Sequence, residues 1–253
     1  NMSRTNFKEL LQAGVHFGHL KKKYNPAMAP YIFMEQNGIH IIDLNKTLAM
    51  IEEAASAMKQ IAKSGKKILF VATKKQAKTV VAETAKKLDM PYITERWPGG
   101  LLTNFSTIRK SIKKMDGIDK MKVDGTFDSL SKRERLQISR TREKLEINLG
   151  SIVKMNRMPE AIFIIDINKE HIALKESVKL GIRSFAVTDT NTNPNNVNFP
   201  IPGNDDASKS IAYIVDIVSK AIAEGLEERA EEQNKKALEK QKKAKKISEE
   251  AKK

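Results

Sequence analysis

Short apolar runs alternate with longer amphipathic segments along much of the chain. Ile68 to Ala72, Ala161 to Ile165 and Ser184 to Val187 are largely apolar runs of strand length. Gln76 to Leu88 and Glu170 to Leu180 instead repeat apolar residues at helical spacing. Continuous apolar strands separated by helices are typical of a parallel sheet that is covered on both faces. The pattern therefore predicts an α/β fold with a central parallel sheet.

Further elements are expected around this sheet. Asn37-Gly38 separates two short apolar runs, which is a signal for a β-hairpin with a tight turn. Asn45 has the side chain of an N-cap and directly precedes a helical pattern. We expect helices over Asn6 to Ala13, Lys46 to Lys63 and Asp206 to Ala223, and strands over Tyr31 to Met34, Ile39 to Ile42 and Pro91 to Thr94.

One segment departs from the alternation of strands and helices. Between Phe105 and Pro159 two long helical patterns follow each other without a strand, and Ser131 with Glu134 forms a capping-box signature for the second pattern. We interpret this segment as an antiparallel helical hairpin inserted into the α/β fold. The chain is thus predicted to contain an α/β core of residues 1–104 and 161–225, a helical hairpin of residues 105–160, and a charged tail of residues 226–253 that is a marginal helix or disordered.

The charge balance favours a polyanionic partner. The chain has 46 Lys and Arg against 31 Asp and Glu, a net charge of +15. It contains no cysteine, which excludes disulfides, thiol catalysis and cysteine-ligated zinc. We find no apolar run of about 18 residues and no signal peptide, so that we expect a soluble cytoplasmic protein without a membrane partner.

The residues do not support an enzyme. A dinucleotide site needs closely spaced glycines after a strand, and none are present; Gly65-Lys66 resembles a fragment of a P-loop but precedes a strand. Asp166 and Asp189 end two predicted strands, where catalytic carboxylates often lie, but no nucleophile or base accompanies them and we favour turn or capping roles. We therefore predict no catalytic residue, no cofactor and no small-molecule substrate.

Two histidines could in principle bind a metal. His16 and His19 are three residues apart, but the sequence offers no cysteine and no carboxylate close to them. We predict no metal site, and we expect these side chains to pack in the fold or to contact an RNA backbone.

Several basic stretches favour binding to RNA. The run of three lysines that ends at Lys23 stands beside Tyr24, an aromatic ring that can stack on a base or pack on ribose. Lys74 and Lys75 follow a predicted strand at a helix N-terminus, where amides also favour phosphate. Trp97 is either a core anchor or a contact to RNA. The predicted RNA-binding residues are Lys21, Lys22, Lys23, Tyr24, Asn25, Lys74, Lys75, Arg96, Trp97, Gly99, Gly100, Thr103, Asn104, Arg109, Lys110 and Lys113, with Arg133, Arg135, Arg140 and Arg142 as secondary candidates.

The same stretches resemble a known family over residues 5–225. The motifs that carry this likeness are His16-Phe17-Gly18-His19 with Tyr24-Asn25-Pro26, Asn37 to Leu44 with Lys46-Thr47, Arg96-Trp97 with Gly99-Gly100, Leu102 to Phe105 and Thr107-Ile108-Arg109, and Asp189-Thr190-Asn191 with Asn193-Pro194 and Ile201 to Ala207. Together they resemble the signatures of the small-subunit ribosomal protein S-two family. Tyr24 stands where the family often has tryptophan, and Ile167 stands where proline is usual.

The resemblance implies more than composition does. It implies a flavodoxin-like three-layer domain with an inserted coiled-coil hairpin, and a structural protein of the small ribosomal subunit. Binding of small-subunit ribosomal RNA near the junction of head and body, and help in docking the neighbouring ribosomal protein S-one, are further implications. Two other classes remain open on the residues alone: an α/β enzyme that uses a nucleotide, and a free-standing RNA-binding factor.

Overall fold

The centre of the protein is a parallel sheet of five strands. The computed structural model describes residues 4–250, and the side chains of residues 4–235. The strands are β4 (Ile68–Val71), β5 (Tyr92–Ile93), β6 (Ala161–Ile165), β7 (Arg183–Thr188) and β8 (Phe199–Pro202), in the spatial order β5-β4-β6-β7-β8. All four pairings are parallel. Counted from β4, this is the order 2-1-3-4-5 of flavodoxin-like sheets, so the predicted α/β class is confirmed.

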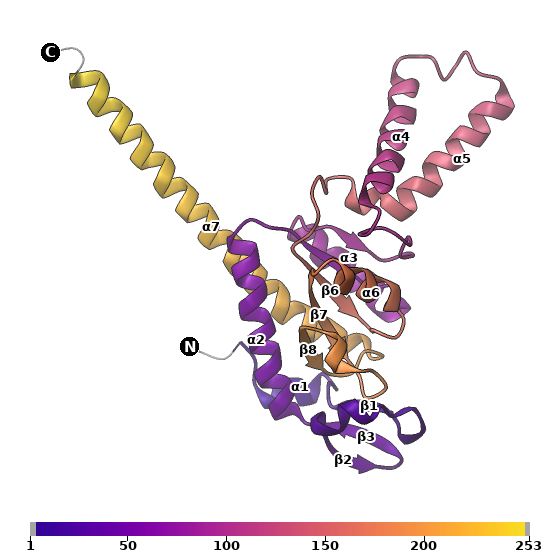
Figure 1. Ribbon diagram of the computed structural model, residues 1–253, viewed down its shortest axis with the longest axis vertical. Coiled ribbons are helices and arrows are strands. Elements are labelled where there is room, and N and C mark those ends of the chain that lie inside the picture. The colour runs from indigo at the N-terminus through magenta and orange to yellow at the C-terminus, as the bar shows by residue number, and fades with distance from the viewer. Residues whose placement is uncertain (1–3, 251–253) are drawn as a thin grey trace.

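Helices cover both faces of this sheet (Figure 1). Alternate strand residues such as Phe70 and Phe163 face one apolar cluster, which they share with α2 (Leu44–Lys63), α3 (Lys75–Lys87) and α7 (Ser208–Glu250). Their neighbours Leu69 and Ile162 face a second cluster, which α6 (His171–Lys179) and the segment around Trp97 complete. The short helix α1 (Phe7–Gln12) packs against α2. The two clusters make the body a three-layer structure.

A small antiparallel sheet lies beside this body. It contains β1 (Phe17–Leu20), β2 (Ile32–Gln36) and β3 (Ile39–Ile42) in the order β1-β3-β2. Asn37 and Gly38 both have positive φ, 53° and 75°, so that the predicted tight turn is confirmed. Three 3-10 turns lie near these sheets, η1 (Lys21–Lys23), η2 (Pro26–Tyr31) and η4 (Pro194–Asn196).

Two long helices extend from the body as an arm. Helix α4 (Phe105–Val123) leads away from the body and α5 (Lys132–Leu149) returns to it, followed by the turn η3 (Gly150–Ile152). We call residues 105–149 the α4–α5 arm. The guanidinium of Arg142 on α5 donates to both carboxylate oxygens of Asp119 on α4 at 2.9 and 3.1 Å. The capping box of Ser131 and Glu134 is present at the start of α5, as predicted.

One predicted helix start was wrong and two strands were missed, each for a physical reason. Helix α2 begins at Leu44, because its N-cap is Asp43 and not the predicted Asn45. The carboxylate of Asp43 accepts a hydrogen bond from the backbone N–H of Asn45. Strand β1 was missed because it is short and pairs with β3 in an irregular register. Strand β8 was missed because it contains two prolines; as the edge strand it pairs with β7 alone, and an edge position tolerates proline.

Helix α7 is longer than the prediction, which ended it at Ala223. It runs on to Glu250, through most of the charged segment. Its first extra turns are tied to α2 by ion pairs between Lys59 and Glu228 at 2.7 Å and between Lys63 and Glu232 at 3.0 Å. Carboxylates spaced four residues apart on α7 thus face lysines spaced four apart on α2, a long-range match that hydrophobic periodicity does not reveal.

Candidate nucleic-acid interface

The three lysines of η1 are exposed at the surface. Lys21 pairs with Glu35 of β2 at 2.8 Å, and both of these side chains are exposed. The ring of Tyr24 contacts the ring of His40 at 4.9 Å, while the side chain of Asn25 caps η2 by accepting a hydrogen bond from the amide of Ala27. The local fold therefore fixes Tyr24 and Asn25 and leaves the ammonium groups at the surface.

Lys74 is held inside the protein. Its ammonium group lies 2.6 Å from Asp205, 2.5 Å from Asp206 and 3.3 Å from Asp166. Burial alone would lower the pKa of Lys74, but the bonds to Asp205 and Asp206 raise it. Lys74 would have to break three ion pairs to reach a phosphate. The next residue, Lys75, is exposed at the first turn of α3.

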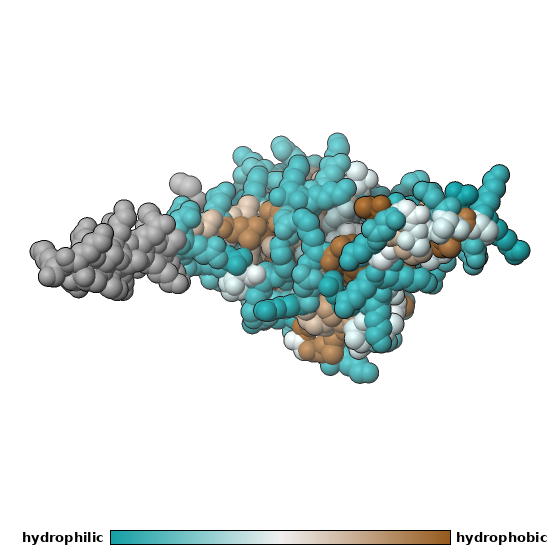
Figure 2. Space-filling view, turned by 90° about the horizontal axis from the view of Figure 1, so that it is seen from above, coloured by the Kyte–Doolittle hydropathy of each residue, from teal (hydrophilic) through white to brown (hydrophobic). Residues whose placement is uncertain are grey.

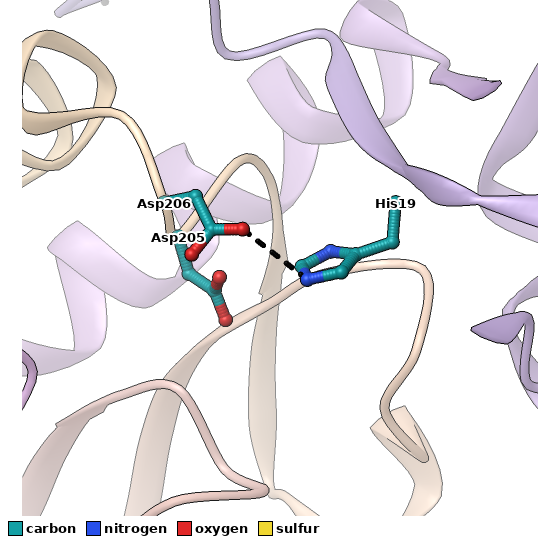
Figure 3. A group of neighbouring side chains, drawn as sticks. All are labelled: His19, Asp205 and Asp206. Atoms are coloured by element: carbon teal, nitrogen blue, oxygen red, sulfur yellow. Dashed lines mark ion pairs between the residues drawn. The ribbon is translucent and has the colours of Figure 1, made fainter.

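Figure 3 shows a histidine and two carboxylates near the carboxyl ends of the central strands. The Nε2 atom of His19 lies 3.2 Å from Asp206, and its Nδ1 atom lies 2.9 Å from Asp189. The bond to Asp189 raises the pKa of His19 although burial opposes the rise. Burial and repulsion from Asp189 raise the pKa of Asp205 to about 7. The cluster thus places carboxylates around Lys74 and His19.

This cluster corrects one inference from the sequence. His19 was thought to have no carboxylate nearby, yet the fold brings it close to Asp189, Asp205 and Asp206. Ligand atoms of His19, Asp205 and Asp206 lie within 4.8 Å of one another, a spacing that suits a divalent cation, and Lys74 shares the two carboxylates. Asp166 and Asp189 also accept backbone hydrogen bonds from Lys169 and Thr190, which agrees with the turn roles that the sequence favoured.

The loop before α4 is held by one carboxylate from α6. Glu176 accepts five hydrogen bonds: from Nε1 of Trp97 at 3.1 Å, from the amides of Gly100, Leu102 and Thr103, and from the hydroxyl of Thr103. Burial would raise the pKa of Glu176, but these donors lower it. Trp97 is buried and acts as a core anchor. The neighbouring Arg96 and Gly99 are exposed.

The base of the α4–α5 arm contains a second internal bond. The guanidinium of Arg109 donates to the carbonyl oxygens of Val153 and Met155 at 3.2 and 3.4 Å, which fastens α4 to the segment that leaves the arm. Asn104 is the N-cap residue of α4, but its side chain accepts from the hydroxyl of Thr107 instead of from a helix amide. Lys110 and Lys113, by contrast, are exposed.

The arginines of α5 divide in the same way. Arg142 is bonded to Asp119 and lies 3.3 Å from Glu146, and Arg135 is 3.9 Å from Asp128. Arg133 and Arg140 are exposed on the surface of the helix. The secondary candidates therefore include two arginines with partners inside the arm and two that face solvent.

Sequence reasoning did not name Glu176, Asp205 or Asp206 as site residues, although Asp205 and Asp206 stand in one of the family motifs. Glu176 lies in the middle of a helical pattern, where a charged residue is typical of a solvated position, and its partners lie more than 70 residues away in the chain. Asp205 and Asp206 carried a signal, since two adjacent acids follow a segment that ends at the edge of the sheet. The segment was not identified as a strand, and so the signal was not used.

Among the described residues, no helix combines the length and the apolar character needed to cross a membrane.

The chain was compared with protein families and with curated proteins. Residues 10–225 match the family model of ribosomal protein S2. The small ribosomal subunit protein uS2 of Phocaeicola vulgatus is 66% identical over 232 residues, which cover 92% of this chain and 83% of the relative. The uS2 protein of Bacteroides fragilis is 64% identical, over 92% of this chain and 84% of the relative. The one of Flavobacterium johnsoniae is 62% identical, over 93% and 92%.

Proposed function

Because the chain belongs to the ribosomal protein S2 family, whose members are structural proteins of the small ribosomal subunit in the cytoplasm, we propose that it binds small-subunit ribosomal RNA through phosphate and shape contacts near the junction of head and body. We also propose that its role is structural and not enzymatic, in keeping with the name of the family. The single observation that supports RNA binding best is that η1 consists of three consecutive exposed lysines.

The contacts of the candidate residues divide them into two roles. Lys21, Lys22, Lys23, Lys75, Arg96, Lys110 and Lys113 are exposed and are proposed as phosphate contacts. Tyr24, Asn25, Gly99, Gly100, Thr103 and Asn104 shape the loops beside them. Lys74, Trp97 and Arg109 are bonded within the protein, and we propose that they position the RNA-binding loops.

The arm has a place in this proposal. We propose that residues 105–160 form an antiparallel hairpin inserted into an α/β core of residues 1–104 and 161–225, and that Lys110 and Lys113 meet RNA near its base. Both are on α4, close in sequence to Arg109, whose bonds fix that part of the arm to the body. Residues 226–250 continue α7 and are proposed as a separate extension.

The small antiparallel sheet offers a surface of a different character. Phe17, Leu20 and Met34 are 49%, 54% and 46% exposed. Phe17 and Met34 both pair with Ile41, and Leu20 pairs with Ile39, so these side chains share one face of the sheet. An exposed apolar face of this kind is typical of a protein-binding surface. We propose that it docks the neighbouring ribosomal protein S-one.

The first experiment tests ribosomal binding directly. Purified protein is titrated onto small subunits that lack it, at several salt concentrations and with unrelated structured RNA as competitor. We expect one copy to bind each subunit and to resist the competitor. Weak binding that the competitor abolishes would contradict the proposal and favour a free-standing RNA-binding factor.

A variant then tests the lysine run. Replacing Lys21, Lys22 and Lys23 by alanine should weaken binding and flatten the slope of log affinity against log salt by about 0.9 for each phosphate that these lysines neutralise. The matched control replaces Lys8, Lys209 and Lys220, which are also exposed and change the net charge equally. An unchanged slope in the first variant, or equal effects in both, would remove η1 from the proposed interface.

A further inference from the structure

The α4–α5 arm contains an apolar groove between its two helices. The groove has a volume of about 480 Å³. It is lined by Lys114, Gly117, Ile118 and Met121 from α4 and by Gln137, Ile138 and Thr141 from α5. Figure 2 looks toward the tip of the arm and shows pale and brown residues running along it between hydrophilic ones. The arm therefore has an apolar strip between its helices, in which Ile118 is buried and Met121 and Ile138 are partly exposed.

Gly117 has no evident role inside the chain. It lies in the interior of α4, where glycine destabilises a helix relative to alanine. A Cβ atom added to Gly117 would meet no described atom within 4 Å, so the packing of the chain itself does not require glycine here. Because Gly117 has no side chain, the groove stays open at this position to a side chain of another molecule.

The groove is bordered by positive charge. A second hollow of about 580 Å³ lies against α5 and shares Gln137 and Thr141 with the groove. Its lining includes Arg133, Arg140 and Lys144, which recur at helical spacing along one side of α5. Within the described residues, no carboxylate lines either hollow. The surface thus combines an apolar strip with a cationic border on one flank.

We propose that the α4–α5 arm docks an acidic amphipathic helix of a neighbouring protein, whose apolar stripe lies in the groove and whose carboxylates face Arg133, Arg140 and Lys144. Two helices that flank an apolar groove receive a third by packing side chains into it, which is a common mode of helix recognition. The cationic border selects an acidic partner and sets its orientation.

RNA fits this surface less well. A phosphate needs hydrogen-bond donors, and a base needs a flat ring on which to stack. Among the described residues, Lys114 is the one cation that lines the groove itself, the cations of the second hollow lie on one flank, and no aromatic side chain lines either hollow. Burying the apolar strip therefore calls for an apolar partner surface.

The absence of cysteine from the chain allows a clean test. Gln137→Cys places one thiol on the shared edge of the two hollows, and Glu143→Cys places one on an exposed position elsewhere on α5. Each full-length variant is labelled with a maleimide, once free and once assembled into small subunits. We expect assembly to slow labelling at position 137 by about tenfold or more and at position 143 by less than about twofold. Equal rates at position 137 in both states would overturn the proposal.

A benzophenone maleimide on the same thiol identifies what covers the groove. In assembled subunits, the crosslinked peptide should come from another protein and should carry acidic residues beside apolar residues at helical spacing. Crosslinks to RNA alone, or to a basic or non-helical segment, would overturn the proposal. Gly117→Leu provides a second variant that should fold, since its side chain enters open space, and it should abolish the protein crosslink by filling the groove. An unchanged crosslink in Gly117→Leu would also overturn it.

Discussion

Single charged residues in this protein act through partners that are remote in sequence. Lys74 was identified as a phosphate contact by its type and its place after a strand, yet its ammonium group is bonded to carboxylates more than 90 residues away. Trp97 is tied in the same way to Glu176. A sequence shows which residues are charged, but the pairing depends on which loops meet at the edge of the sheet. For this reason the sequence identifies the basic residues but does not show which of them are paired inside the protein.

Glu176→Gln should destabilise the loop before α4. The amide that replaces one carboxylate oxygen donates hydrogen bonds and would face amide donors, so we expect a decrease of about 2–3 kcal/mol in the free energy of unfolding. Chemical denaturation at pH 7 measures it.

The same site predicts a pH dependence. The pKa of Glu176 is lowered in the folded protein, so its contribution is fully present above the pKa of the unfolded chain and is lost as pH falls through the lower, folded pKa. The difference between wild type and Glu176→Gln should therefore shrink in acid. A difference that stays constant down to pH 2 would contradict the assignment.

Lys74→Met should be strongly destabilising. It leaves Asp166, Asp205 and Asp206 close together without their shared cation, and removal of one partner from a buried charge cluster costs about 3–5 kcal/mol. Adding Asp205→Asn removes one of the buried negative charges and should recover part of this stability. Thermal unfolding of the wild type, the single variants and the double variant measures the coupling between these residues. Additive effects of the two substitutions would show that they do not interact.

At the scale of elements, the buried strands were predicted well; of the edge strands, β2 and β5 were predicted and β1 and β8 were missed. Strand β6 runs from Ala161 to Ile165, as its unbroken apolar run predicted, because both of its faces are covered. Strands β1 and β8 pair with a single neighbour each; β1 is irregular in register and β8 contains two prolines, so neither has the unbroken apolar run of a central strand. Helix α7 exceeded its prediction because ion pairs with α2 accompany its extra turns and, among the side chains described there, Leu226 packs against the core.

Gly117→Ala should stabilise α4. Alanine gains about 0.5–1 kcal/mol over glycine in a helix interior, and no described atom lies close enough to oppose the added methyl group. The change in the free energy of unfolding of the isolated protein, measured by denaturant titration, tests this. Gly150→Ala is a useful comparison, because its Cβ would lie 2.6 Å from the carboxylate of Glu146, and we expect it to stabilise less or to destabilise.

At the scale of the whole molecule, distinct surfaces project from one α/β body. The arm and the long helix α7 leave the body in different directions, while the small antiparallel sheet lies at its other end (Figure 1). The net charge of +15 suits an RNA-rich particle, but the charge is interrupted by apolar areas on the small sheet and on the arm. This separation lets one chain contact RNA and protein neighbours at the same time.

A pair of substitutions tests this separation. Phe17→Glu with Met34→Glu places two charges on the exposed face of the small sheet, away from the lysines of η1, and we expect retention of ribosomal protein S-one on purified subunits to fall at least about tenfold. Binding of the variant to the subunit itself should be unchanged. Cosedimentation with both readouts measures this, and Val123→Glu, exposed on the arm, is the control. Unchanged retention of S-one would place its binding site elsewhere.

Trp97 has one more consequence, for spectroscopy. It is the only tryptophan of the chain, and its indole N–H is bonded to Glu176 at the root of the arm. The intrinsic fluorescence of the protein excited at the red edge therefore reports on one place, the junction between the body and the arm. Its emission will shift when this junction opens and will be insensitive to events at the tip or along α7. The protein carries its own optical probe for how firmly the arm is anchored before and after assembly.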